Sequence, residues 1–191
     1  MGDPAERRAT YQDVLEAPPN MVAEVIFGVL HTFPRPRVRH AMASSVIGSE
    51  LGGPFGRGRG GPGGWVILDE PELHLGNEPD IIVPDLAGWR RERMPRIPRD
   101  EAFIVQPPDW VCEVLSPSTQ ALDRTDKMEI YRRETVTHVW HVDPEGRTLE
   151  VFRLDPQLLR YVQAAVWRGD MMVRAEPFDA IELELSALWA E

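Results

Sequence analysis

An isolated acid inside an apolar stretch is the first feature of this sequence that suggests chemistry. Glu113 is the only charged residue of the segment Trp110–Leu115, and strand alternation would place it on one face with Val111 and Leu115. A carboxylate in the middle of such a strand is costly to bury unless it is paired with a cation or binds a metal. The alternatives are an edge strand that leaves Glu113 in water and a salt bridge to an arginine.

A second acid, Asp85, follows the apolar run Ile81–Val83 at a bend that Pro84 is expected to produce. Alone, an acid in this place is most simply a turn residue. If its strand lies beside that of Glu113, however, the two carboxylates could converge on one divalent cation. Their oxygen ligands suit Mg²⁺ or Mn²⁺, which bind through one or two carboxylates together with a substrate phosphate. Asp80, which also follows a proline, is the alternative for this acid.

Lys127 is the only lysine among the 21 lysine and arginine residues of the chain. A sequence this biased towards arginine is expected to use arginine wherever a positive charge alone is needed. The single lysine therefore suggests a site that requires the compact amine rather than the planar guanidinium. From the helix expected after Glu113, this amine could reach back to the sheet, orient an attacking water and offset charge in the transition state. The alternative is that Lys127 lies on an exposed helix and has been retained there by chance, without a functional role.

Three further residues are candidates for accessory groups. Glu24 lies in a predicted hairpin and could be an additional acid near the metal, although a structural hydrogen-bond acceptor is the simpler interpretation. His40 stands where a helix is expected to begin, and such a histidine more often satisfies the helix start than binds a ligand. Tyr131 lies one helical turn beyond Lys127 and shares its face, so it would either fix the lysine or pack against the core.

The net charge of −10 argues against general coating of nucleic acid, which needs a strongly basic surface. Arginines nevertheless cluster at residues 35–39, 57–59 and 90–99, where a local phosphate-binding face could form on an acidic protein. Solvated loops explain the same pattern equally well. The candidates for contacts to a phosphate backbone are Arg57, Arg59, Arg90, Arg91 and Arg93.

The N-terminal half is expected to alternate short elements with breaks rich in proline and glycine. Thr10 would cap a short helix, and two β segments would flank Gly28 as a hairpin. An amphipathic helix would follow, and then a flexible surface loop. The expected ranges are Met21–Phe27 and Val29–Phe33 for the hairpin, His40–Leu51 for the helix, Phe55–Gly64 for the loop, and Trp65–Leu68, Glu72–Leu75 and Ile81–Leu86 for further apolar strands.

In the C-terminal half, the candidate residues Glu113 and Lys127 are expected on a strand and on the helix that follows it. Trp110–Leu115 is expected to be a buried strand, Ser116–Thr119 a turn, and Asp123–Glu134 a helix with Asp123 as its N-cap. The alternation of strands with two or three helices predicts an α/β fold, or a similar α+β fold, in a single domain that spans residues 1–191. The further strands are expected at His138–Val142, Thr148–Leu154, Tyr161–Val166 and Ile181–Leu185.

Composition narrows the class of protein. A hydrophobic content of 42% is enough to build a core without a disulfide or a structural metal. The sequence has no run of apolar residues long enough to span a membrane, and its start lacks the apolar stretch of a secretory signal. The single cysteine, Cys112, excludes an internal disulfide and a multi-cysteine zinc site. A reducing, cytoplasmic location is the simplest expectation.

Several segments resemble the Uma family of restriction endonucleases, a branch of the PD-(D/E)XK nuclease superfamily. The most specific is Glu113-Val-Leu-Ser-Pro-Ser-Thr119 with Asp123 and Lys127 downstream, whereas the Pro84-Asp85 pair alone is weak. The segment Glu24–Leu30 resembles the N-terminal hairpin of that family. The resemblance covers most of the chain, roughly residues 10–155.

The resemblance implies a restriction-endonuclease-like core, in which helices flank a mixed central sheet, and Mg²⁺-dependent hydrolysis of DNA phosphodiesters. Asp85 matches the first acid of the motif and Glu113 the second, so these carboxylates and the main-chain carbonyl of Val114 would hold Mg²⁺ or Mn²⁺. The chain departs from the superfamily pattern two residues after Glu113, where Leu115 takes the place of the lysine. The Uma family commonly relocates this lysine to the helix, where Lys127 stands.

Three functions remain open from the sequence. The first is an endonuclease that cuts DNA with Asp85, Glu113 and Lys127 as catalytic residues, and a homodimer would give it one site for each strand. The second is a nuclease fold that binds nucleic acid or protein with little or no cleavage, which the net charge and the missing strand lysine would favour. The third is a metal-dependent hydrolase of a smaller phosphodiester.

Overall fold

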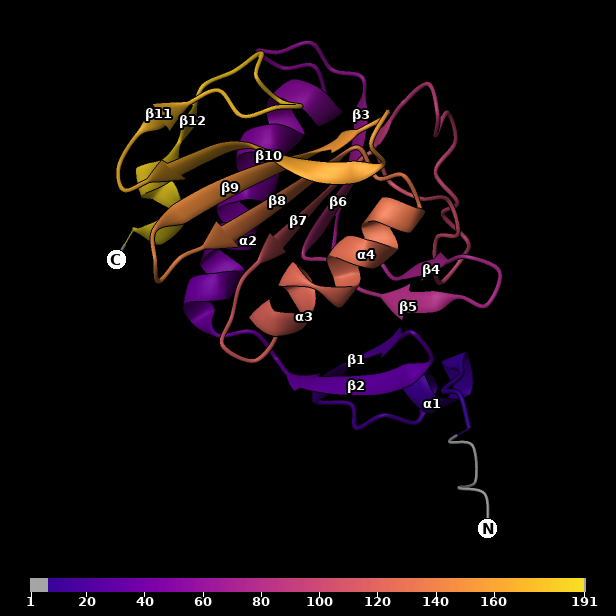
Figure 1. Cartoon of the computed structure of the whole chain (residues 1–191). Coiled ribbons are helices and arrows are strands. Elements are labelled where there is room, and N and C mark those ends of the chain that lie inside the picture. The colour runs from indigo at the N-terminus through magenta and orange to yellow at the C-terminus, as the bar shows by residue number, and fades with distance from the viewer. Residues whose placement is uncertain (1–6, 191) are drawn as a thin grey trace.

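A six-stranded mixed sheet runs through the centre of the computed structural model, which describes residues 7–190 (Figure 1). The strand order is β10-β9-β8-β7-β6-β3, and β7 and β8 are parallel while all other neighbours are antiparallel. The strands are β3 (Trp65–Asp69), β6 (Leu86–Arg90), β7 (Trp110–Val114), β8 (His138–Asp143), β9 (Thr148–Asp155) and β10 (Arg160–Arg168).

The parallel pair explains where the helices beside the candidate site lie. Two parallel neighbours cannot be joined by a tight hairpin, so the chain must cross over one face of the sheet between them. Helices α3 (Gln120–Arg124) and α4 (Asp126–Arg133) form this crossover. Strand β7 is buried along its whole length, which fits its nearly continuous apolar sequence. The crossover therefore sets α4 directly over the face that carries Glu113.

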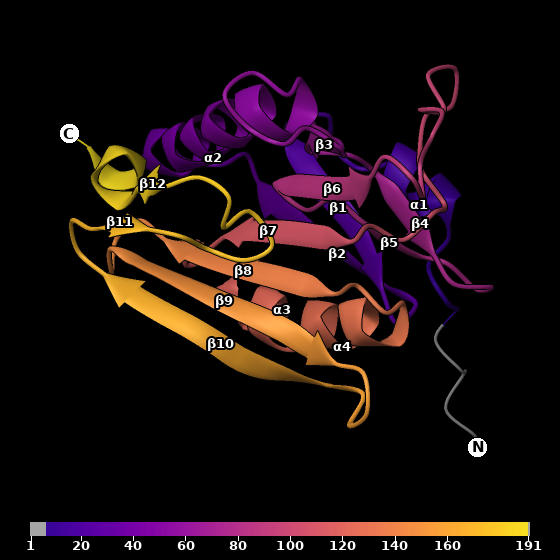
Figure 2. The same cartoon turned by 90° about the horizontal axis from the view of Figure 1, so that it is seen from above.

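The two faces of the sheet are covered differently, as Figure 2 shows. Helix α2 (Val38–Leu51) packs on one face together with the C-terminal segment and its 3₁₀ helix η2 (Leu185–Trp189). Helix α4 packs on the other face, where Ile130 and Tyr131 join the core. Among the helices of residues 7–190, none is long and apolar enough to cross a membrane.

A second, antiparallel sheet lies against the α4 side of the molecule and supplies one wall of the candidate site. Its strand order is β2-β1-β5-β4. The hairpin pairs Met21 with Pro34 and Ile26 with Val29, and β1 then pairs with β5 through Val25 and Ile81. The strands are β1 (Met21–Ile26), β2 (Val29–Pro34), β4 (Leu73–Leu75) and β5 (Asp80–Ile82), and the short helix α1 (Tyr11–Leu15) precedes them.

The predicted fold class, the N-terminal hairpin and the short helix capped by Thr10 are confirmed. Helix α2 begins two residues earlier than predicted, at Val38. The loop predicted at Phe55–Gly64 is wrong at its start, because Phe55 lies in a π-helical turn, η1 (Gly52–Gly56), and is buried in the core. The prediction placed Phe55 in a surface loop because its neighbours are rich in glycine.

Two further element predictions need correction. The single helix predicted at Asp123–Glu134 is two helices, because the backbone of Thr125 leaves the helical region between α3 and α4. Asp123 therefore lies inside α3 and does not cap a helix. The terminal strand predicted at Ile181–Leu185 is reduced to β12 (Leu183–Glu184), which pairs only with β11 (Met172–Val173) outside the main sheet.

Phe178 closes the core on the α2 side, and its removal should be costly. Its ring lies 4.7 to 5.7 Å from the rings of Phe55, Trp65, Trp110 and Trp140. We expect Phe178→Ala to lower the free energy of unfolding by about 3–5 kcal/mol, because it leaves a cavity among these rings. Urea denaturation measures the loss. Met172→Ala, at an exposed residue of the same segment, should change stability by less than about 0.5 kcal/mol; an equal loss in both variants would contradict this account.

Candidate active site

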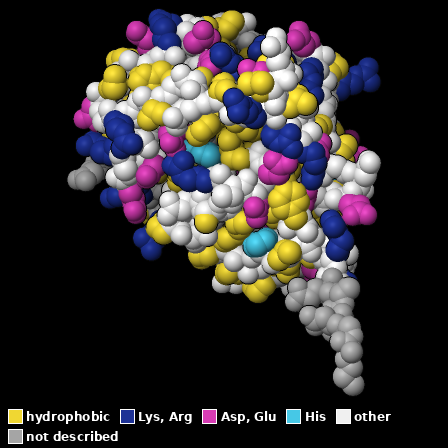
Figure 3. Space-filling view, viewed as in Figure 1, with side chains coloured by type: hydrophobic (Ala, Val, Ile, Leu, Met, Phe, Trp, Pro, Cys, Tyr) yellow, Lys and Arg dark blue, Asp and Glu magenta, His cyan; other side chains and the backbone are white. Residues whose placement is uncertain are grey.

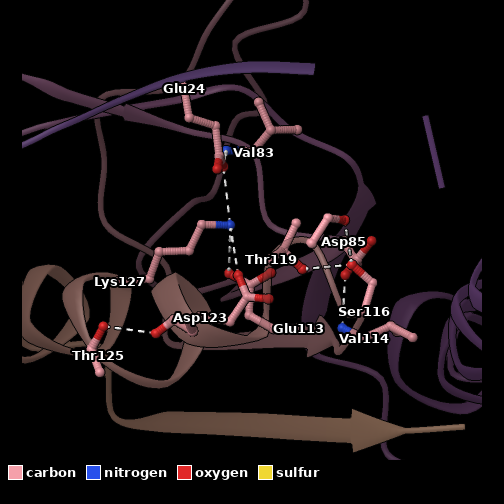
Figure 4. Close-up of polar contacts among 12 residues, drawn as sticks. Glu24, Val83, Asp85, Glu113, Val114, Ser116, Thr119, Asp123, Thr125 and Lys127 are labelled. Carbon is pink, nitrogen blue, oxygen red and sulfur yellow. Dashed lines mark hydrogen bonds and ion pairs between the residues drawn. The ribbon is translucent and has the colours of Figure 1, made fainter. Parts of the chain in front are cut away.

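The amine of Lys127 is buried on α4 and faces three carboxylates. Its Nζ lies 3.0 Å from Glu24 Oε1, 3.2 Å from Asp123 Oδ1 and 3.4 Å from Glu113 Oε1 (Figure 4). Each of the four side chains is at most 4% exposed. The predicted approach of Lys127 to a buried Glu113 is therefore confirmed by the geometry.

The three acids come from separate parts of the fold. Glu24 projects from β1 of the second sheet, Glu113 from β7 of the main sheet, and Asp123 from α3, four residues before the lysine. Glu24 is also held by the backbone, because Val83 N–H donates to its Oε1 at 2.7 Å. The interpretation of Glu24 as a structural hydrogen-bond acceptor is confirmed, and Glu24 also contacts Lys127.

Tyr131 supports the site through Glu113. Its hydroxyl donates a hydrogen bond of 2.5 Å to Glu113 Oε1. Of the two predicted alternatives, packing is confirmed because Tyr131 is buried in the core, whereas its hydroxyl bonds to the acid and not to the lysine. One oxygen of Glu113 thus receives Tyr131 and Lys127 together, which fixes the direction of this carboxylate.

Asp85 lies at the bend between β5 and β6, as the proline before it predicted. Its Oδ2 accepts a hydrogen bond of 2.7 Å from Val114 N–H, and its Oδ1 contacts His40 Nε2 on the first turn of α2. The N–H and C=O of one strand residue point to the same side. The carbonyl of Val114 therefore faces the edge at which Asp85 lies, next to the strand position of Glu113.

The cluster is short of positive charge. Burial raises the pKa of Glu113 well above its usual range, and burial likewise raises the pKa of Glu24 although Lys127 opposes it. Burial lowers the pKa of Lys127, but Glu113, Glu24 and Asp123 outweigh this effect and raise that pKa well above its usual value. One ammonium thus faces three buried carboxylates, more negative charge than it can neutralise.

This donor set fits a small, hard divalent cation. Asp85, Glu113 and the Val114 carbonyl offer oxygen atoms only, and an added cation would relieve the excess of negative charge. Within residues 7–190, no group of three or more His, Cys, Asp or Glu side chains is arranged to hold a metal. Mg²⁺ and Mn²⁺ commonly take one or two carboxylates and complete their shell with water or substrate.

The acids line a pocket of about 840 Å³ that opens beside the hairpin. Asp85, Glu113, Asp123 and Lys127 all line it, so the structure brings the predicted trio together. The arginine cluster at residues 35–39, noted in the sequence but not among the five named candidates, also lines this pocket: Arg35 and Arg37 precede α2, and Arg39 lies in its first turn.

The arginines predicted as phosphate contacts lie elsewhere. All five are described by the structure, and none lines the pocket. Strand β6 runs antiparallel to β7, so Arg90, at its end, lies beyond Trp110 and at the opposite end of the sheet from Asp85. Arg90 stacks over Trp65, Arg91 donates to the Trp65 carbonyl and Arg93 pairs with Asp109. Arg57 and Arg59 are exposed in the loop that leads to Trp65, at the same distant end.

Asp80, the alternative first acid, is occupied by another interaction. Its Oδ2 pairs with Arg133 Nη1 at 2.8 Å, and its Oδ1 accepts a hydrogen bond from Phe27 N–H. Its position at the start of β5 places it away from the pocket, whose lining includes Asp85 instead. The geometry therefore favours Asp85.

Two buried polar residues of this region were missed by the sequence reasoning. Asp123 was assigned to a helix cap, although its spacing of four residues before the only lysine could have indicated an ion pair. His141 on β8 is the register neighbour of Glu113 and is buried. Burial lowers the pKa of His141 to about 3, and the positive charge of Arg124 adds to the effect.

His141 should make stability depend on pH. An unfolded histidine titrates near pH 6.5, so between there and about pH 3 the unfolded chain binds the extra proton and stability falls as pH falls. One such group contributes up to about 1.4 kcal/mol per pH unit. We expect His141→Leu to reduce the slope of unfolding free energy against pH in this window, measured by urea denaturation. His31→Leu, at a half-buried residue of β2, is the control; an unchanged slope in His141→Leu would show that His141 is not buried neutral.

Comparisons with known proteins agree with the fold. A comparison with curated protein sequences finds no match. Among solved structures, the chain is similar to the crystal structure of "a putative nuclease" from Anabaena variabilis, with a TM-score of 0.70 and 23% identity over 95% of this chain and 98% of that one. Residues 8–187 match the Uma2 family, described as "Putative restriction endonuclease". Because this match spans nearly the whole chain, the protein belongs to the Uma2 family.

Proposed function

We propose that this chain is a Mg²⁺-dependent endonuclease that hydrolyses DNA phosphodiester bonds, with Asp85, Glu113 and Lys127 as its catalytic residues. One observation carries the proposal: the only lysine of the chain places its amine 3.4 Å from a buried strand glutamate, in a pocket that Asp85 also lines. The family description supports DNA as the substrate.

Each residue has a distinct part in the proposed reaction. Asp85 and Glu113, with the carbonyl of Val114, would hold the divalent cation. That cation would supply positive charge to stabilise the charge that develops on the phosphate oxygens. Lys127 would donate a hydrogen bond to the attacking water and orient it towards phosphorus.

The neighbouring groups act as positioning residues. Glu24 and Asp123 hold the ammonium of Lys127 from two sides, so the amine cannot swing away from Glu113. Tyr131 fixes Glu113, and His40 fixes the carboxylate of Asp85. Such preorganisation matters because a small misplacement of a catalytic group costs much of the rate.

A binding module without cleavage is the second candidate. One observation favours it: the ammonium of Lys127 already has three carboxylate partners, and each would compete with a water molecule for its hydrogens. Cleavage assays on duplex, single-stranded and branched DNA with Mg²⁺ or Mn²⁺ separate the two candidates. If the parent protein binds DNA and cuts none of these substrates, the binding module replaces the nuclease.

Metal binding should be visible without any reaction. Since a cation would offset the buried negative charge, we expect Mg²⁺ to raise the melting temperature by roughly 5–10 °C at a concentration about one hundred times its dissociation constant. Asp85→Asn should abolish this rise, since it removes a charged ligand but keeps an acceptor for Val114 N–H. Asp80→Asn, at the acid held by Arg133, is the matched control and should keep it. A rise that survives in Asp85→Asn would remove Asp85 from the metal site.

Lys127→Ala should lower the rate of plasmid cleavage by about 10²–10³-fold, because it removes the donor that orients the water. The variant also leaves three buried acids without their cation, which destabilises by about 3–5 kcal/mol unless they take up protons. Lys127→Arg keeps the charge and should still cut poorly, since the planar guanidinium cannot replace the amine.

The control for Lys127 is Arg124→Ala, which removes one positive charge from the same crossover but leaves the cluster intact, because Arg124 pairs with Glu150. This variant should cut at the parent rate. Circular dichroism confirms that each variant is folded before its rate is compared. Parent-like cleavage by either folded Lys127 variant would show that the assignment of the lysine is wrong.

A further inference from the structure

We infer that the pocket takes an unpaired DNA strand rather than an intact duplex, with Arg35 and Arg37 as contacts to its phosphates. The inference rests on the proposed function for the identity of the substrate as DNA. It concerns which form of DNA can reach the buried acids and along which surface the strand runs.

The depth of the reacting groups is the first argument. The side chains of Glu113 and Lys127 are 3% and 4% exposed, so a phosphate must enter the pocket to meet them. Strand β1 lies on one side of these groups and the α3–α4 crossover on the other (Figure 4). A volume of about 840 Å³ is that of a small-molecule site. A duplex would have to bring its second strand along, whereas a single strand is thin enough to enter alone.

The apolar wall is the second argument. One part of the lining is built from the α1–β1 connection and the end of β2, and it presents mainly carbon. Bases of an intact duplex are stacked on each other and hide their faces, whereas an unpaired strand exposes them and gains by packing them on such a surface. The residues of this wall are Leu15, Pro18, Pro19, Met21, Phe33 and Pro34.

The arginine segment is the third argument. Arg35, Arg37 and Arg39 line the pocket, are exposed, and form no ion pair with any residue in the range 7–190. Arg35 and Arg37 are two positions apart in extended chain before α2, so both can project to one side. Free guanidinium groups beside a pocket are ready phosphate ligands.

The distribution of charge on the surface outside the pocket argues against a broad face that binds duplex DNA. Duplex binding relies on a broad basic face that neutralises many phosphates. On the face seen in Figure 3, acidic and basic side chains are interspersed. The same pocket also contains Glu70 and Glu72, which would repel phosphates and so favour a strand path on the arginine side. Among the residues that line the pocket, the exposed positive charge comes from Arg35, Arg37 and Arg39.

Fluorescence anisotropy tests the inference without cleavage. The probes are a fluorescein-labelled single-stranded oligonucleotide of mixed sequence and a blunt duplex that contains it, both in EDTA. We expect the parent to bind the single strand at least about tenfold more tightly than the duplex, and the double variant Arg35→Ala/Arg37→Ala to lose about tenfold of single-strand affinity. Loss of two phosphate contacts should also reduce the slope of log affinity against log salt by about 1.4.

The matched control is Arg57→Ala/Arg59→Ala, which removes two exposed arginines that do not line the pocket. It should stay within about twofold of the parent in affinity. Equal or tighter binding of the duplex by the parent would overturn the inference. So would a larger loss in the control than in Arg35→Ala/Arg37→Ala, since the phosphate path would then lie at the other end of the sheet.

The experiment separates this inference from the proposed function. Arginine-dependent binding of the single strand together with no cleavage in Mg²⁺ or Mn²⁺ would support the binding inference and refute the nuclease. Cleavage that depends on Lys127 but prefers an intact duplex would support the nuclease and refute the inference.

Discussion

The buried ammonium of Lys127 ties together three separate elements of the fold. Glu24 comes from the second sheet, Glu113 from the main sheet and Asp123 from the crossover, and all three lie within 3.4 Å of one nitrogen. Charges buried this deeply are tolerated only when they are paired. The way in which the hairpin, the central sheet and the crossover meet is therefore constrained by one electrostatic requirement.

The need to pair these buried charges also favours the binding of a cation at the site. The cluster holds more buried acid than base, and burial raises the pKa values of Glu24 and Glu113. A divalent cation bound there would offset part of this excess of negative charge. The same deficit of positive charge that costs stability in the free protein thus favours the binding of a metal, which is how sites for chemistry commonly differ from structural ion pairs.

Local features of the sequence carried much of the fold and the centre of the site. The sequence was sufficient to predict three features: the apolar strand that contains Glu113, the bend before Asp85, and the single lysine after them. Each of these features depends on residues that are close in sequence. The N-terminal hairpin could be predicted from the sequence for the same reason. The split between α3 and α4 was not, because it depends on the conformation of Thr125 within the packed crossover. Phe55 was misassigned because burial of a residue in a glycine-rich turn depends on distant rings.

The sequence by itself determined which residues have unusual chemistry: an acid in an apolar strand and the only amine among many guanidinium groups. Composition and alternation suffice for that, since they depend on residue type and spacing alone. Only the tertiary structure decided which acids surround Lys127 and which arginines reach the pocket. The pairing of β6 with β7 sent Arg90 to the distant end of the sheet, while the turn from β2 into α2 brought Arg35 and Arg37 to the acids. Contacts of this kind depend on strand order and direction, which arise from the packing of the whole chain.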